Sequence, residues 1–138
     1  MMDAKARAKI RETPLKFKRV LLVDDEKEIG EIFGDIFTDL GMDWKYAING
    51  KVALDILSAE GIGGFDLIIS DVRMPVMDGH KFLTELKKKH ATIPDFIFLT
   101  GFADRTPEEL MALGARAVYA KPLDLMELEK ILRGIPTA

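Results

Sequence analysis

Cysteine is absent from this 138-residue chain, and so is any apolar run long enough to cross a bilayer. Without cysteine the protein can form neither disulfide bonds nor thiolate metal sites. A membrane-spanning helix needs about 20 apolar residues, so we expect no membrane span. The N-terminus is charged and has no apolar segment behind it, so we expect no secretory signal peptide. These absences favour a cytoplasmic protein.

Internal repeats and low-complexity segments are also missing. The length suits one domain with one core, and a hydrophobic fraction of 48% is ordinary for a globular protein. The two histidines, His80 and His90, have no partner at the spacing of a metal site. The sequence therefore predicts a single globular domain.

The charge is unevenly distributed along the chain. Residues 1–20 contain seven Lys or Arg and two acids, for a net charge of +5, whereas the remainder carries −8. An acidic body argues against direct nucleic-acid binding. We expect residues 1–16 to form a flexible basic extension, in which residues 4–12 could be helical until Pro14 ends the helix. The extension could contact an acidic partner or could simply be a solvated tail.

From residue 17 onward, short apolar runs alternate with segments of helical periodicity. The pattern predicts strands near residues 19–23, 44–48, 66–71, 95–100 and 117–120. It predicts helices near residues 29–40, 51–59, 79–90, 106–114 and 124–134. Such alternation is typical of an α/β fold, with right-handed βαβ units, a parallel five-stranded sheet and helices on both faces. We expect this domain to cover residues 17–134, leaving residues 135–138 as a tail too short for an output domain.

Two of these helices have apolar stripes that we expect to face the core. In the first helix the stripe consists of Ile29, Ile32, Phe33, Ile36, Phe37 and Leu40. In the last helix it consists of Leu125, Leu128, Ile131 and Leu132. Gly30 and Gly34 lie inside the first helix, where we interpret them as sites of close packing or of tolerated exposure.

Chemically active side chains follow the strands. Asp24 and Asp25 end the first strand, Asp71 ends the third, Thr100 ends the fourth and Lys121 ends the fifth. The carboxyl ends of parallel strands meet at one edge of the sheet, where open α/β folds bind their ligands. We therefore expect these five residues to converge in one site.

Crowded carboxylates repel one another, and a hard divalent cation relieves that repulsion. We expect Mg²⁺ to be held by Asp25, Asp71 and the backbone carbonyl of Arg73, with Asp24 acting through water. The ion would also neutralise charge on an incoming phosphoryl group.

We interpret Asp71 as the nucleophile that accepts this group as an acyl phosphate. Lys121 would supply a point charge to one phosphoryl oxygen, and the Thr100 hydroxyl would donate to another.

Each residue also has a plainer interpretation. Asp24 or Asp25 alone could cap the first helix, Thr100 could be an ordinary hydroxyl at a strand end, and Lys121 could be a solvated charge. A phosphatase using Asp24 as its nucleophile is a further alternative. That chemistry requires an Asp-x-Asp pair, whereas Asp24 is followed by Asp25 and Glu26.

Five short motifs, in this order along the chain, resemble those of the receiver domain of the two-component response regulator family. The chain is similar in length to the chemotaxis response regulator of that family. The motifs are Val23-Asp24-Asp25-Glu26, Asp71, Met74-Pro75-Val76-Met77-Asp78-Gly79, Thr100-Gly101 and Lys121-Pro122. The resemblance implies a flavodoxin-like (βα)5 fold with strand order 2-1-3-4-5. It also implies a cis Lys121–Pro122 bond, which only X–Pro allows at low cost.

The resemblance further implies phosphotransfer. A phosphohistidine on a histidine kinase or a histidine phosphotransfer domain would give its phosphoryl group to Asp71. The receiver would catalyse this transfer and the later hydrolysis, but would act chiefly as a signalling switch in a phosphorelay. Thr100 would then move toward the phosphate, and the face formed by the helix after Thr106, the strand 117–120 and the last helix would change for an unidentified downstream protein. The open alternative is a receiver-like interaction module that phosphorylation does not regulate.

One position departs from the family. Most receivers carry Tyr or Phe three residues before the lysine, where this chain has Val118. Tyr119 comes one residue later, and because strand side chains alternate it should point to the opposite face. We expect Phe102 to be the aromatic residue that replaces the missing ring.

Overall fold

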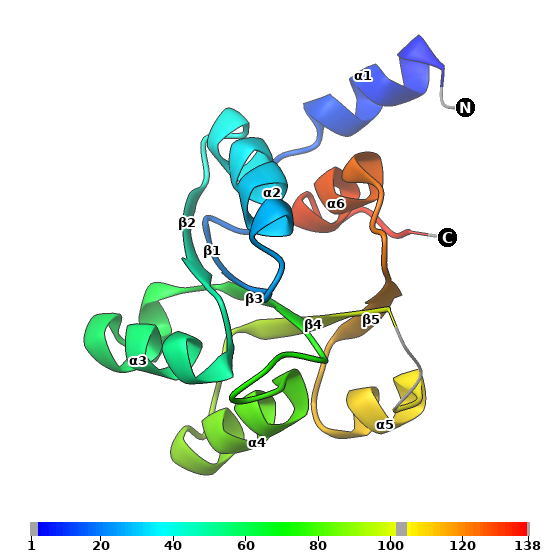
Figure 1. Ribbon diagram of the computed structural model, residues 1–138. Coiled ribbons are helices and arrows are strands. Elements are labelled where there is room, and N and C mark those ends of the chain that lie inside the picture. Colours follow the sequence, from blue (N-terminus) through cyan, green and yellow to red (C-terminus); the bar gives the residue numbers. More distant parts are fainter. Residues whose placement is uncertain (1–2, 102–104, 138) are drawn as a thin grey trace.

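The computed structural model describes residues 3–101 and 105–137. Its centre is a parallel five-stranded sheet in the order β2-β1-β3-β4-β5 (Figure 1). The strands are β1 Arg19–Val23, β2 Asp43–Ala47, β3 Leu67–Asp71, β4 Asp95–Thr100 and β5 Ala117–Ala120. This arrangement confirms the predicted fold class and strand order.

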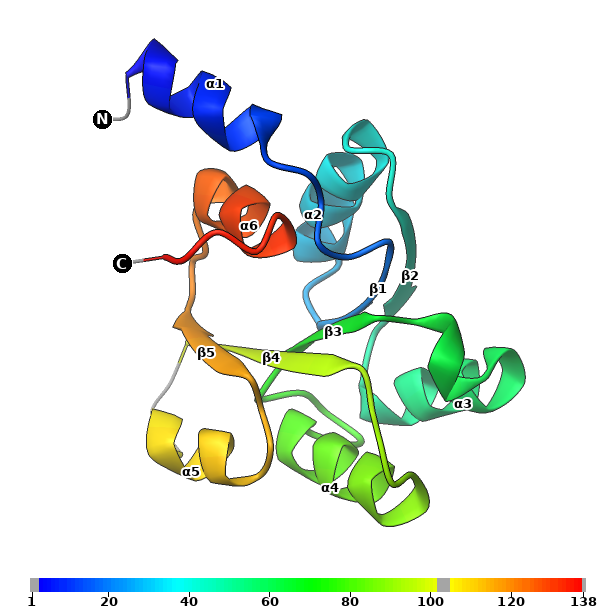
Figure 2. The ribbon, with the colours of Figure 1, turned by 180° about the vertical axis from the view of Figure 1, so that it is seen from behind.

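Helices cover both faces of the sheet (Figures 1 and 2). The covering helices are α2 Lys27–Asp39, α3 Gly50–Glu60, α4 Gly79–Lys89, α5 Pro107–Ala112 and α6 Leu125–Leu132. Helix α1 Ala4–Glu12 projects away from the sheet, and a 3-10 turn η1 lies at Ile62–Gly64. Core residues of α3, α4 and α5 form one apolar cluster with the sheet, and those of α2 and α6 form another. The sheet is therefore a layer between two separate cores.

The central strands are apolar on both sides because both sides are covered. Successive residues of β1 alternate between the two clusters, so that Leu21 and Val23 lie in one while Val20 and Leu22 lie in the other. All four are fully buried. The continuous apolar runs of the sequence thus place each strand end, with its polar residue, at one edge of the sheet.

Gly30 and Gly34 are sites of close packing between α2 and β2. A Cβ atom on Gly34 would lie 2.3 Å from the Trp44 ring, and one on Gly30 would lie 2.8 Å from the Tyr46 ring. The absence of side chains lets these two rings pack directly on the helix backbone. Of the two interpretations from the sequence, close packing is confirmed.

Two predicted core residues are exposed instead. Ile32 is 47% exposed and Leu125 is 43% exposed. Both belong to helical apolar stripes, but each lies at the margin of its stripe, beyond the reach of the sheet. They line one groove between α2 and the segment that precedes α6. The prediction that both face the core was wrong, because helical periodicity does not show how much of a stripe a sheet covers.

The N-terminal residues form a helix that joins the domain through its linker. Asp3 caps α1 by accepting a 2.8 Å hydrogen bond from the Ala6 amide. Beyond the helix, Arg133 donates a 2.5 Å bond to the Thr13 carbonyl, and the Lys16 amide donates to the Leu132 carbonyl at 2.8 Å. These bonds tie the linker to the end of α6.

Among the described residues, no helix is long and apolar enough to cross a membrane.

Val76, in the loop after β3, has an unfavourable backbone conformation. Its φ angle is 71°, and its side chain is 80% exposed. Left-handed backbone costs an L-residue about 1–2 kcal/mol, and asparagine tolerates it better than a β-branched residue. We therefore expect Val76→Asn to raise the free energy of unfolding by about 1 kcal/mol in urea titrations. The control is Ile32→Asn, which replaces an exposed apolar side chain in a regular helix and should not raise the free energy of unfolding. If Val76→Asn were no more stable than the wild type, the proposed backbone strain at Val76 would be contradicted.

Candidate functional site

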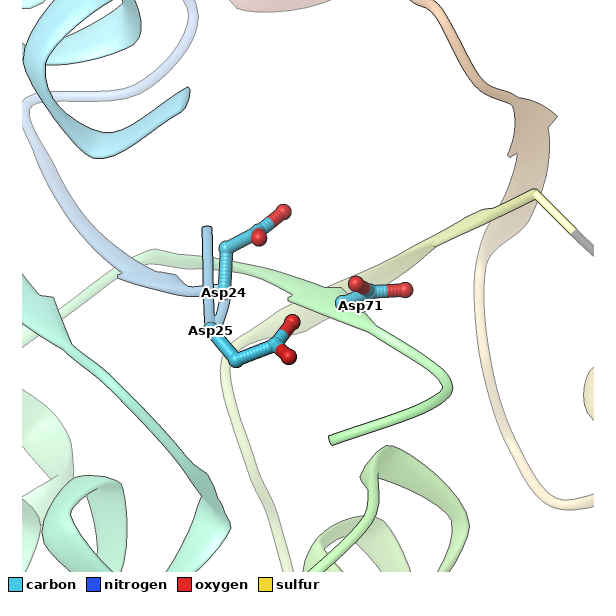
Figure 3. Close-up of side chains that lie close together, drawn as sticks. All are labelled: Asp24, Asp25 and Asp71. Carbon is cyan, nitrogen blue, oxygen red and sulfur yellow. The ribbon is translucent and has the colours of Figure 1, made fainter. Parts of the chain in front are cut away.

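Three carboxylates converge at the carboxyl edge of the sheet (Figure 3). Asp24 and Asp25 follow β1, and Asp71 ends the neighbouring strand β3. One oxygen from each residue lies within 4.8 Å of the others. Asp24 and Asp71 are buried, whereas Asp25 is more exposed. The structure thus brings together the three acids that the sequence singled out.

Asp24 is held by the turn that leads into α2. Its Oδ1 atom accepts a 2.8 Å hydrogen bond from the Glu26 amide, and its carbonyl accepts a 2.5 Å bond from the Tyr46 hydroxyl. Glu26 occupies the N-cap position of α2, so neither Asp24 nor Asp25 is the cap. Asp24 Oδ2 is buried, and no backbone amide or hydroxyl of the described residues donates a hydrogen bond to it. A buried oxygen of this kind needs a cation nearby.

Lys121 supplies one such cation from the end of β5. Its Nζ atom lies 2.9 Å from Asp24 Oδ2, 2.9 Å from Asp71 Oδ2 and 3.2 Å from Glu26 Oε1. The Lys121–Pro122 bond is cis, which confirms the expectation from the resemblance. One ammonium group therefore bridges the acids of two strands and the start of α2.

Burial raises the pKa of Asp24 and of Asp71, and the positive charge of Lys121 opposes the rise in both. Burial would lower the pKa of Lys121, but its contacts with the two carboxylates outweigh burial and raise this pKa above its usual range. Lys121 accordingly stays charged, while the two acids remain incompletely compensated. An additional cation would favour their ionised forms.

The residues present fit a magnesium ion. Asp25, Asp71 and Arg73 line one cavity of about 230 Å³, which Thr100 and Lys121 complete. Carboxylate and carbonyl oxygens are the ligands that Mg²⁺ prefers, and one oxygen from each of Asp24, Asp25 and Asp71 lies within 4.8 Å of the others. Asp25, Asp71 and the Arg73 carbonyl would hold the ion, with Asp24 behind them.

Thr100 reaches this cavity from the end of β4. It pairs with Ala120 in the sheet, and its carbonyl accepts a 2.9 Å hydrogen bond from the Lys121 amide. Thr100 and Lys121 are thus fixed relative to each other by the backbone. The five residues that the sequence placed at strand ends all lie at this edge.

Three supporting residues were missed from the sequence. Glu26 contacts the lysine, Tyr46 donates to the Asp24 carbonyl, and the buried Ser70 hydroxyl donates to the Asp71 carbonyl at 2.8 Å. A polar serine inside the otherwise apolar run of β3 was the one available signal. Contacts across 95 residues, such as that of Glu26 with Lys121, leave no local pattern.

Val118 and Tyr119 point to opposite faces of the sheet. Val118 packs against the cluster of α3, α4 and α5, and Tyr119 packs against that of α2 and α6. The predicted one-residue offset of the aromatic ring is therefore confirmed. Phe102, which we expected to replace that ring, lies outside the described residues.

A parallel five-stranded sheet with an acidic cluster at its carboxyl edge is the arrangement of a receiver domain, and a comparison with protein families gives the same assignment. The family model of the response regulator receiver domain matches residues 20–133. The chain belongs to this family, the receiver domains of two-component systems.

Individual relatives support the assignment. Sporulation initiation phosphotransferase F of Bacillus subtilis is 31% identical over 117 residues, covering 84% of this chain and 91% of the relative. The probable transcriptional regulator ycf27 of Cyanidium caldarium is 39% identical over 123 residues, covering 86% of this chain and 47% of the relative. The regulatory protein AtoC of Escherichia coli is 34% identical, but the chain spans only 24% of its length. Some relatives are thus much longer than the matched domain.

Solved receiver structures have the same fold. The Francisella response regulator 1452 receiver domain is 30% identical, with a TM-score of 0.73 and coverage of 85% of this chain and 97% of that one. The Thermotoga maritima response regulator TrrA, solved in complex with Mg²⁺ and BeF, is 29% identical with a TM-score of 0.71. The match covers 85% of this chain and 97% of the Thermotoga chain.

Proposed function

We propose that Asp71 accepts a phosphoryl group from a phosphohistidine donor in a reaction that requires Mg²⁺. One observation carries the proposal: three carboxylates lie within 4.8 Å of one another, and Lys121 Nζ lies 2.9 Å from Asp71 Oδ2. The donor would be a histidine kinase or a histidine phosphotransfer domain. A cytoplasmic location is part of this proposal and remains a prediction from the sequence.

In the proposed step an oxygen of Asp71 attacks phosphorus. The P–N bond of phosphohistidine breaks, and the imidazole, which carries a proton on its other ring nitrogen, keeps the electron pair and leaves as a neutral group. Phosphoryl transfer depends mainly on positioning and on compensation of charge. Lys121 would turn from the carboxylates to a phosphoryl oxygen, and the Thr100 hydroxyl would donate to another. Bound Mg²⁺ would neutralise negative charge on the transferred group.

Burial distinguishes Asp71 from the alternative nucleophile Asp24. Asp24 is 0% exposed and does not line the cavity, whereas Asp71 is 7% exposed and does. A donor phosphorus can reach only an exposed carboxylate oxygen. This difference supports Asp71 as the nucleophile. Asp24 holds Lys121 and would contact a bound Mg²⁺ through water.

An apolar groove beside the site supports a protein donor. The groove has a volume of about 560 Å³, and the exposed Ile32 and Leu125 lie on it together with Lys121. Exposed apolar side chains at such a groove are typical of protein-binding surfaces. We propose that the donor docks here, with its phosphohistidine directed at Asp71.

The proposed output surface is the face formed by α5, β5 and α6. Thr100 is in register with Ala120, so a movement of Thr100 would reach β5 directly. Val118 packs on the α5 side of that strand but has no ring to rotate. We therefore propose that the signal passes through the loop before α5 and the α5 backbone to a downstream protein.

Two comparisons support this chemistry. The Bacillus relative is named a phosphotransferase, and the Thermotoga structure contains Mg²⁺ and BeF. Both proteins are matched over more than nine-tenths of their length. Their chemistry is the basis for proposing the same ion and the same kind of transfer here.

Incubation with a small phosphodonor and Mg²⁺ should add one phosphoryl mass to the protein. EDTA should abolish the addition, because the ionised carboxylates would then repel the anionic donor. Intact-protein mass spectrometry measures both results. Labelling that persists unchanged in EDTA, or labelling at several sites, would contradict the proposal.

A further inference from the structure

A wider recess adjoins the cavity that contains Asp71. Its volume is about 640 Å³, and the loop after β3 forms much of its wall. Two arginines, Arg73 and Arg105, line it together with Asp25 and Asp78. The remaining wall is apolar and comes from residues 72 and 74–75.

The recess and the inner cavity are continuous through shared residues. Asp25 and Arg73 line both spaces, whereas Asp71 and Lys121 line only the inner one. The inner cavity, of about 230 Å³, also adjoins the apolar groove through Lys121. Of these two neighbouring spaces, the recess is lined by arginine side chains and the groove is mainly apolar, so a negatively charged leaving group fits the recess better.

Arg105 gives the recess an anion-binding group. Within residues 3–101 and 105–137 it forms no ion pair or hydrogen bond, although it is only partly exposed. The nearby Asp78 is engaged elsewhere, since its Oδ1 atom caps α4 by accepting a 2.8 Å bond from the Lys81 amide. A guanidinium group binds a carboxylate through two parallel hydrogen bonds.

We propose that the recess is the leaving-group subsite for phosphodonors and that Arg105 binds a carboxylate leaving group. The proposal rests on the proposed function of Asp71. The subsite would discriminate between small donors by the charge of the leaving group, favouring acyl phosphates, which are mixed anhydrides of a carboxylic acid and phosphate, over phosphoramidates.

The reaction balances without a further reactant. Asp71 forms a new O–P bond while the P–O bond to the acyl group breaks. The carboxylate takes the electron pair and leaves as an anion, so no proton is required. Arg105 would stabilise the charge that develops on it. In a phosphoramidate the protonated nitrogen leaves as a neutral amine, and Arg105 has no charge to stabilise.

The test compares two donors on the same variants. Arg105→Gln should lower kcat/KM for labelling by acetyl phosphate about tenfold, mainly through kcat, because a hydrogen bond to a charged group is lost. Labelling by phosphoramidate should change by less than about twofold, the effect of losing an exposed charge. Arg105→Lys should restore part of the acetyl phosphate rate. The control is Arg116→Gln. Arg116 pairs with Asp95 at the start of β4, the end of the strand away from the site, so its loss should alter neither rate.

The outcomes separate this inference from the proposed function. An equal loss with both donors in Arg105→Gln would show a structural role and overturn the subsite. Unchanged acetyl phosphate kinetics would overturn it as well. Failure of the wild-type protein to accept phosphate from either donor would instead overturn the proposed function.

Discussion

Asp71→Asn should abolish phosphoryl labelling by any donor. An amide is a poor nucleophile, so the variant cannot form the acyl phosphate. The fold should survive, because Asn has nearly the same shape and removes a buried charge whose cost is seen in the raised pKa of Asp71. Intact-protein mass spectrometry after incubation with acetyl phosphate and Mg²⁺ measures the loss, and circular dichroism checks the fold.

The matched control for this variant is Asp3→Asn. Asp3 is exposed and caps α1, away from the site, at a position where asparagine serves equally well. The control should be labelled like the wild type. Full labelling of Asp71→Asn would mean that another residue accepts the phosphoryl group.

Lys121→Met should have the second large effect, on stability and on transfer together. Removing Nζ leaves Asp24 and Asp71 without the cation that lies 2.9 Å from each. Breaking a buried ion pair by removing one partner costs about 3 kcal/mol or more. We expect a loss of about that size in EDTA and a partial recovery on addition of Mg²⁺. Labelling should fall roughly 100-fold even with the ion present, because one charge on the transferred group is no longer compensated.

Urea titrations with EDTA or Mg²⁺ measure the stability change, and time courses of labelling measure the rate. Lys81→Met is the control, because Lys81 is exposed on α4, away from the acidic cluster. It should match the wild type in both assays. A Lys121→Met variant as stable in EDTA as the wild type would contradict the role of Lys121 as the bridging cation.

The layered fold could be predicted because its physical causes are local. Apolar runs at β3 and β4 are continuous, since helices cover both faces of the sheet, and the helices between them have a clear period. The location of the site could also be predicted, because the carboxyl ends of parallel strands all lie at one edge of the sheet. Asp71, Thr100 and Lys121 were found for that reason, and the alternation of strand side chains was sufficient to place Tyr119 opposite Val118.

Other features depend on how elements meet in space. Ile32 and Leu125 belong to helical stripes, but their exposure depends on the width of the sheet beneath each helix. Glu26 reaches Lys121 across 95 residues, and no spacing rule predicts that contact. The left-handed backbone of Val76 could not be predicted from the sequence either, because valine normally avoids that conformation.

The most direct measurement of the central claim locates the phosphoryl group in the chain. Borohydride reduces an aspartyl phosphate to homoserine, which marks the modified residue permanently. After labelling with acetyl phosphate and Mg²⁺, reduction and digestion, peptide mass spectrometry should find homoserine at position 71. Homoserine at Asp24, Asp25 or Asp78, with residue 71 unchanged, would contradict the account.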